Sequence, residues 1–185
     1  MANHVQKFTA RPTLITLMLR EDHQKVRQLF DQFHDTTHAQ EKRDIVTAAL
    51  VALEVLATLK EELIYPAWRE HLNEQNLMDE ALKEHQIVHV LINELKNMDP
   101  EDKRYGLKFT ALSIHVQHHI NEEEGKMFPQ AEKAELDWEG LTTHVIERRH
   151  SLEQKPLWLL GVPVVFASES VRGTPALLTR NRSGG

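Results

Sequence analysis

The chain has 185 residues, of which 41% are hydrophobic and 27% are charged, as in an ordinary globular domain with its own core. A formal net charge of −6 and the lack of a strongly basic patch argue against a nucleic-acid interface. The absence of cysteine excludes a disulfide framework, an iron–sulfur cluster and a thiolate zinc site, whereas twelve histidines are an unusual number.

The two ends of the chain show no membrane or export signal. Residues 1–12, which we predict to form an N-terminal arm, lack the apolar stretch of a signal peptide. The longest apolar run, PLWLLGVPVVFA at residues 156–167, is interrupted by Gly161 and Pro163 and is too short to span a membrane. We therefore expect a cytoplasmic protein.

Helix-breaking residues are rare in the first half of the chain. Between Thr13 and Asp99 there is no glycine, and the only proline is Pro66, which we expect to end or kink a helix. Amphipathic periodicity predicts four long helices and a shorter fifth one, at about residues 13–35, 41–65, 77–98, 100–124 and 137–150.

This arrangement predicts an all-α fold, an antiparallel up-down four-helix bundle over residues 13–150 with a short fifth helix. Residues 151–185 hold four of the seven glycines and three of the seven prolines, which predicts a poorly ordered C-terminal tail. We expect the apolar segment of this tail to dock on the bundle. A membrane-surface contact and an incidental extension are the alternatives, and the modest number of basic residues disfavours the former.

Four polar residues fall on the apolar stripes of three predicted helices: His23, His85, His119 and Glu123. A lone histidine on such a stripe is usually an ordinary core residue, but three unpaired imidazoles in one core would carry an uncompensated desolvation cost. His119 and Glu123 are one helical turn apart and can reach a common ion. Imidazole and carboxylate without sulfur suit iron, manganese or zinc, and iron is favoured where open positions bind oxygen species.

The motifs around these residues resemble the hemerythrin-like, or HHE cation-binding, family. They are Arg-Glu-Asp-His23, Leu-Lys-Glu-His85, and His119-x-x-x-Glu123 followed by Glu124 and Phe128-Pro129. The resemblance covers about residues 13–150 and implies a bundle with a non-haem di-iron centre. It also implies that His23, His85, His119 and Glu123 are ligands. Proteins of this family bind dioxygen or respond to oxygen, nitric oxide, peroxide or iron.

The chain departs from the family pattern in its second helix. LATLKEELIYP at residues 56–66 aligns with HINEEEGKMFP at residues 119–129, but Leu56 and Lys60 stand where the family has histidine and glutamate. A leucine cannot ligate, and a lysine ammonium repels a cation. The sequence therefore predicts an incomplete or altered di-iron centre.

Three interpretations of this departure remain open. In the first, neighbouring side chains replace the lost ligands; Glu61 borders the site, about 100° around the helix from Lys60. In the second, Lys60 pairs with Glu123, and Leu56 fills the vacated volume. In the third, Lys60 extends to solvent. The residues that could serve in the first are Glu61, Glu62, His89 and His115.

The leading functional hypothesis is iron binding, di-iron or mononuclear, coupled to oxygen, nitric oxide, redox or iron sensing or handling. The expected partners are a metal ion and a small diatomic ligand. The alternative is a metal-free helical scaffold or interaction protein, with Lys60 and Glu123 paired. A peroxidase-like or repair enzyme is less favoured, because it would need an intact metal centre. We interpret the aromatic-Pro pairs at 65–66 and 128–129 as helix terminators, and Glu122 and Glu124 as solvated.

Overall fold

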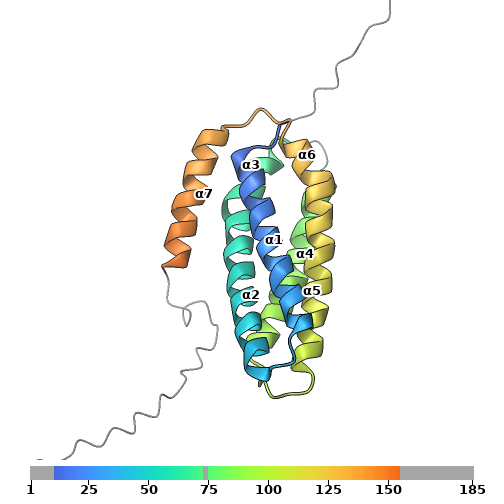
Figure 1. Cartoon of the computed structure of the whole chain (residues 1–185). Coiled ribbons are helices and arrows are strands. Elements are labelled where there is room, and N and C mark those ends of the chain that lie inside the picture. Colours follow the sequence, from blue (N-terminus) through green and yellow to red (C-terminus); the bar gives the residue numbers. More distant parts are fainter. Residues whose placement is uncertain (1–10, 73–74, 155–185) are drawn as a thin grey trace, which may run out of the picture.

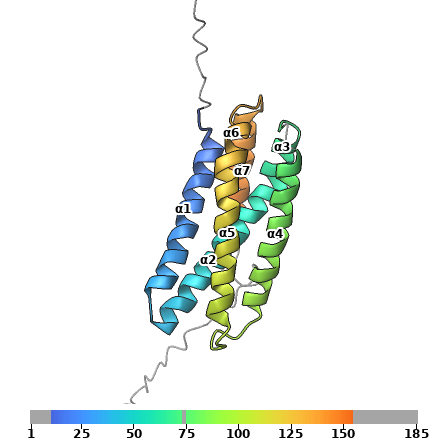
Figure 2. The same ribbon diagram turned by 90° about the vertical axis from the view of Figure 1, so that its right-hand side faces the viewer.

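A computed structural model of the chain describes residues 11–72 and 75–154, and within these ranges it contains helices and no strand (Figure 1). The four helices α1, α2, α4 and α5 lie side by side in a bundle, which Figure 2 shows from a second side. The predicted all-α four-helix bundle is confirmed. Its elements are α1 (Leu14–Asp35), α2 (Ala39–Leu59), the π-helix η1 (Lys60–Ile64), α3 (Tyr65–Arg69), α4 (Gln75–Lys96), α5 (Tyr105–Glu122), the π-helix η2 (Glu123–Met127), α6 (Phe128–Ala131) and α7 (Trp138–Glu153).

Some helix boundaries differ from the predicted ones. The helix expected from Pro100 begins only at Tyr105. Asp99 and Asp102 explain this, because their carboxylates accept hydrogen bonds from the backbone N–H groups of Glu101 and Arg104 at 2.9 and 2.8 Å. Such side-chain bonds hold the backbone in turns and compete with a helix.

Two π-helical turns occupy corresponding places in the aligned segments of α2 and α5. The N–H of Tyr65 donates to the carbonyl of Lys60, and the N–H of Phe128 donates to that of Glu123, each five residues earlier. A proline follows each aromatic residue; it lacks an N–H, and its ring crowds the carbonyl four residues back. A π-turn absorbs this conflict and is often found at functional sites. The chain therefore continues as α3 and α6 past both prolines instead of ending there.

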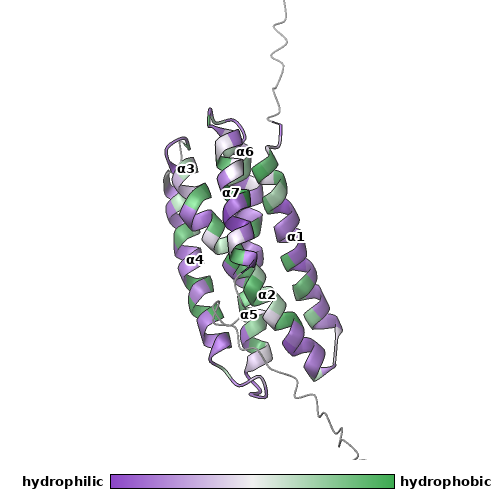
Figure 3. Ribbon diagram, turned by 90° about the vertical axis from the view of Figure 1, so that its left-hand side faces the viewer, coloured by the Kyte–Doolittle hydropathy of each residue, from purple (hydrophilic) through white to green (hydrophobic). Residues whose placement is uncertain are grey.

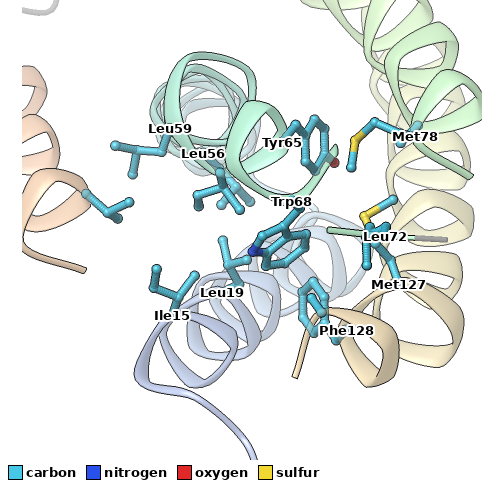
Figure 4. Packing of buried hydrophobic residues seen from close by; sticks show 14 of the residues in the cluster. Ile15, Leu19, Leu56, Leu59, Tyr65, Trp68, Leu72, Met78, Met127 and Phe128 are labelled. Atoms are coloured by element: carbon cyan, nitrogen blue, oxygen red, sulfur yellow. The ribbon is translucent and has the colours of Figure 1, made fainter. Parts of the chain in front are cut away.

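The core consists of two apolar clusters at different heights along the bundle. One surrounds Trp68 and Phe128, which meet edge to face with ring centroids 5.7 Å apart (Figure 4). The other surrounds Phe30 and Phe109, whose ring centroids are 5.5 Å apart. Between the two clusters, α1, α4 and α5 carry buried polar residues, so the bundle has a polar layer between two apolar ones.

Helix α7 packs outside the bundle against α1 and α2 and ends part-way along α2 (Figure 1). Asp137 caps its first turn by accepting a hydrogen bond from the N–H of Gly140 at 2.9 Å. It is mostly hydrophilic in Figure 3 and buries only two of its residues, Val145 and Leu152. Arg148 and Arg149 form ion pairs with Glu62 of η1 and Asp22 of α1.

The described residues cover only part of the predicted domain boundaries. The N-terminal arm (1–12) lies outside them except for residues 11 and 12, and the tail (151–185) lies outside except for residues 151–154, of which 151–153 belong to α7. Within the described part of the chain, no helix is both long and apolar enough to cross a membrane.

The aromatic contact between α1 and α5 gives a test of the fold. Phe109 is 1% exposed, so Phe109→Ala should lower the free energy of unfolding by about 3–5 kcal/mol, because it leaves a cavity. The matched control is Leu107→Ala on the same helix, where Leu107 is 72% exposed and the expected loss is below about 0.5 kcal/mol. Urea unfolding followed by circular dichroism measures both. Equal losses would contradict the helix orientation.

Candidate metal centre

The polar layer of the bundle gathers side chains from α1, η1, α3, α4, α5 and η2. The structure brings together all four residues predicted from the apolar stripes and adds a lysine and a tyrosine. The exposed fractions are 0% for His23, 2% for Lys60 and for Tyr65, 6% for His85, 5% for His119 and 1% for Glu123.

The π-turns explain why both Lys60 and Tyr65 face this layer. In a regular α-helix, residues five apart point in clearly different directions. The i to i+5 hydrogen bond of η1 adds a residue to the turn, so that Tyr65 lies one turn above Lys60 on the same side. The same turn in η2 aligns Phe128 with Glu123.

One half of the centre, which we call the lysine side, is built from Lys60, His23 and Glu123. The Lys60 ammonium donates to Oε2 of Glu123 and to Nε2 of His23, the latter at 3.1 Å. The same carboxylate oxygen lies 3.2 Å from Nε2 of His23. A cationic group therefore already occupies the space between these side chains.

The other half, the tyrosine side, is built from Tyr65, His85 and His119. Nε2 of His85 and Nε2 of His119 are 3.1 Å apart, and the Tyr65 hydroxyl oxygen is 3.2 Å from each. The hydroxyl donates its proton to Oε1 of Glu123 at 2.6 Å, so Glu123 joins the two sides. Three potential ligand atoms thus surround one point.

An outer carboxylate holds each of the three histidines. Because a carboxylate only accepts hydrogen bonds, Nδ1 of each ring carries a proton, and Nε2 of each neutral ring presents a lone pair to the centre. Histidines that bind metals are usually oriented in this way. The pairs are His23 with Glu124 at 2.8 Å, His85 with Glu61 at 2.5 Å and His119 with Glu84 at 2.7 Å.

The tyrosine side consequently lacks a positive charge in its simplest protonation state. The Tyr65 proton goes to Glu123, so the Nε2 lone pairs of the neutral His85 and His119 rings face each other, with the two nitrogen atoms 3.1 Å apart. Either a proton on one ring or a metal ion resolves this. Burial opposes a charge on His119, but the charge of Glu123 and hydrogen bonds to Glu123 and Glu84 raise the pKa of His119 above its ordinary value.

The pKa values of the neighbouring groups shift in different directions. Burial lowers the pKa of His85, and the charges of Lys60 and His119 add to this effect, against a hydrogen bond to Glu61. Burial alone would raise the pKa of Glu123, but Lys60 and His119 hold that pKa well below its usual range. Burial and the charge of Glu123 raise the pKa of the Tyr65 hydroxyl well above its ordinary value. Without a metal ion, Tyr65 is therefore a neutral hydrogen-bond donor.

The two sides fit a metal ion unequally. Donor atoms bound to one ion at 2.0–2.2 Å lie about 2.8–3.6 Å from one another, depending on the coordination geometry. The tyrosine side matches this spacing, with separations of 3.1–3.2 Å among its three donor atoms. The lysine side does not fit, since an ammonium stands between His23 and Glu123 and the facing position on α2 is the buried Leu56. The residues present suit one ion and not two.

The side chains that could replace the missing ligands of the second helix lie at the edge of the polar layer. Glu61 contacts Nδ1 of His85 and Nε2 of His89, the latter at 2.8 Å, and these three residues form a possible outer group of ligands. Glu62 pairs with Arg148 of α7, and His115 is exposed. The third interpretation, in which Lys60 extends to solvent, is wrong, because Lys60 is buried together with its partners Glu123 and His23.

Three residues of the centre were not predicted from the sequence: Tyr65, Glu84 and Glu124. Interpreting Tyr65 only as a helix terminator missed its hydroxyl, although the aligned residue Phe128 has none and that difference was visible. The expectation that Glu124 is solvated is wrong, since its side chain is 22% exposed and binds His23 and Arg27.

A small cavity of about 30 Å³ adjoins the centre. Its polar walls are Lys60, His85 and His119, and the remaining walls are apolar side chains of α2, α4 and α5. A cavity needs roughly 10–15 Å³ to hold one water molecule, so this one has room for a very small ligand.

Comparisons with known proteins agree with this architecture. Residues 14–131 match the family described as the hemerythrin HHE cation binding domain. A crystal structure of a hemerythrin HHE cation binding domain-containing protein from Mycobacterium kansasii is similar in fold, with a TM-score of 0.63 and 20% identity. The match covers 78% of this chain and 95% of that one. No curated protein sequence matches. Because the family match spans well over half of its residues, the chain belongs to the hemerythrin HHE cation-binding family.

Proposed function

We propose that this protein binds a single iron ion on the tyrosine side of the centre and uses it to sense or handle a small diatomic molecule. The observation that carries this proposal is the distance of 3.1 Å between Nε2 of His85 and Nε2 of His119. The Nδ1–H group of each ring donates to a carboxylate, so both Nε2 lone pairs are available to a cation. A cation at that point would satisfy both rings. Tyr65 and Glu123 would complete the ligand set, and Lys60 takes the place of a second ion.

The protein side chains would prepare the site in distinct ways. Glu61 and Glu84 fix the orientation of His85 and His119, so that Nε2 of each ring points inward. Lys60 neutralises Glu123 and keeps a second cation out. An iron ion would supply an open coordination position and a change of oxidation state.

The cavity beside His85 and His119 supports a diatomic ligand. Its volume of about 30 Å³ and its mainly apolar lining suit dioxygen or nitric oxide better than a charged or larger molecule. Reversible carriage of dioxygen by a di-iron centre draws electrons from both irons. A site for one ion therefore favours a sensing or handling role.

The second candidate function is a metal-free scaffold. A proton shared by His119 and His85 would also satisfy the tyrosine side, consistent with the raised pKa of His119 and the lowered pKa of His85. The buried Lys60–Glu123 pair favours this candidate, because it neutralises Glu123 without a metal.

Iron content separates the two candidates. Protein purified without oxygen and reconstituted with ferrous iron should hold one iron per chain, and His85→Ala should lower the content below about 0.2. His144→Ala, at an exposed position of α7, is the matched control and should keep one iron. Elemental analysis after gel filtration measures the content. A chain that takes up no iron would support the scaffold and refute iron sensing.

Restoring the family ligands should create a second site. Leu56→His combined with Lys60→Glu removes the ammonium and supplies two ligands on the lysine side, so iron should rise from one to two per chain. Lys60→Met alone removes the ammonium without adding a ligand and should leave one iron. An unchanged iron content in the double variant would contradict the alignment of Leu56 with His119.

The stability of the metal-free protein tests the Lys60–Glu123 pair. Lys60→Met leaves Glu123 buried without its cation and should lower the free energy of unfolding by about 3–5 kcal/mol. Adding Glu123→Gln removes the unpaired charge and should recover most of that loss. Urea unfolding in the presence of a chelator measures both. A loss below about 1 kcal/mol for Lys60→Met would show that its ammonium is not buried with Glu123.

A further inference from the structure

Helix α2 carries an apolar surface that the rest of the described chain leaves open along a groove between Asp44 and Leu56. Between Ile45 and Leu59, α2 has only three polar residues, and a helix that is hydrophobic on every side is normally covered on every side. Figure 3 shows this hydrophobic stretch of α2 continuing beyond the end of the hydrophilic helix α7. A groove of about 550 Å³ lies there, with walls that include Val26, Ala48, Val51, Ala52, Val55 and Leu56.

The chain itself leads into this groove. Glu153, the last residue of α7, is on the groove's rim with Arg149. Pro156 accounts for the end of the helix, because proline disfavours helical backbone in the residue before it. It also begins the longest apolar run of the sequence, Pro156–Ala167. An apolar segment therefore starts three residues beyond the rim of an open apolar groove.

The length of the groove also matches the length of the apolar segment that follows α7. From Val55 to Asp44, the extent of α2 along the groove, the helix rises by about 16 Å. Five extended residues span about the same distance at roughly 3.3 Å each, so Pro156–Leu160 would fill the groove without a long linker. Because the segment is covalently attached at the rim, its effective concentration at the groove is in the millimolar range. A separate molecule would need a comparable concentration or a higher affinity to displace it.

We propose that the apolar segment that begins at Pro156 docks in the groove between α1 and α2 and that Pro156–Leu160 fills it. Large side chains such as Leu157 and Trp158 pack there against Ala48, Val51 and Ala52. The groove shares Leu56 with the cavity that adjoins Lys60, His85 and His119.

Cysteine pairing tests this proposal in the full-length chain, which has no cysteine of its own. Ala48→Cys in the exposed part of the groove, combined with Leu159→Cys, should give a disulfide within one chain at a rate independent of protein concentration. The control combines Leu159→Cys with Ile146→Cys. Ile146 is 48% exposed on α7, and a freely moving segment would reach it about as easily as it reaches Ala48.

The groove pair should form at least tenfold faster than the control pair, and adding Val51→Asp should remove most of that advantage. Equal rates for the two pairs would overturn the proposal, since they would show that the segment does not prefer the groove. Disulfide-linked dimers at rates that rise with concentration would overturn it in favour of a second copy as the occupant. The assay is run with a chelator, so its outcome does not depend on metal binding.

A second measurement follows the segment without cysteines. The emission of Trp158, obtained as the difference between the native chain and Trp158→Phe, should be blue-shifted and protected from acrylamide. Val51→Asp should shift it to the emission of a water-exposed indole, and Ile146→Asp should not. A water-exposed emission in the native chain would refute docking.

Discussion

A lysine ammonium buried in the middle of a helical bundle must be neutralised close by, because a lone charge there would cost several kcal/mol in lost solvation. In this protein Glu123 neutralises Lys60, and most of the polar centre follows from that contact. Oε2 of Glu123 accepts a hydrogen bond from the ammonium and also lies 3.3 Å from Nε2 of His119, while Oε1 accepts the Tyr65 proton. Under the proposed function, this ion pair determines which half of the centre accepts a metal ion.

The aligned segments 56–66 and 119–129 also have similar backbone conformations. Both aligned segments pass through a π-turn before an aromatic-Pro pair, so corresponding residues face the centre from opposite sides. The side chains at these positions differ: Lys60 opposes Glu123, and Tyr65 corresponds to Phe128. An arrangement that could hold two equivalent ions therefore carries a fixed positive charge in one half and a cluster of electron-rich donor atoms in the other.

Much of the polar centre could be predicted from the hydrophobic periodicity of the sequence. The apolar stripes located four of the six central side chains, since a buried histidine is conspicuous on a hydrophobic face. The burial of Lys60 could not be decided, because a lysine near the end of a helix can as easily extend to solvent. The carboxylates that bind the outer nitrogen atoms of the histidines could not be predicted from the sequence. Glu84 of α4 binds His119 of α5, whereas its position next to His85 in the sequence gives no sign of that contact. Tyr65 could have been identified by comparing the two aligned segments residue by residue.

The central claim is that Lys60 replaces one ion of a two-ion centre while the other position stays functional. Anomalous diffraction at the iron absorption edge, from crystals grown without oxygen in ferrous iron, tests it most directly. The account predicts one anomalous peak among Tyr65, His85, His119 and Glu123, with the Lys60 ammonium beside His23. Two peaks, or one peak between His23 and Glu123 with Lys60 turned away, would contradict it.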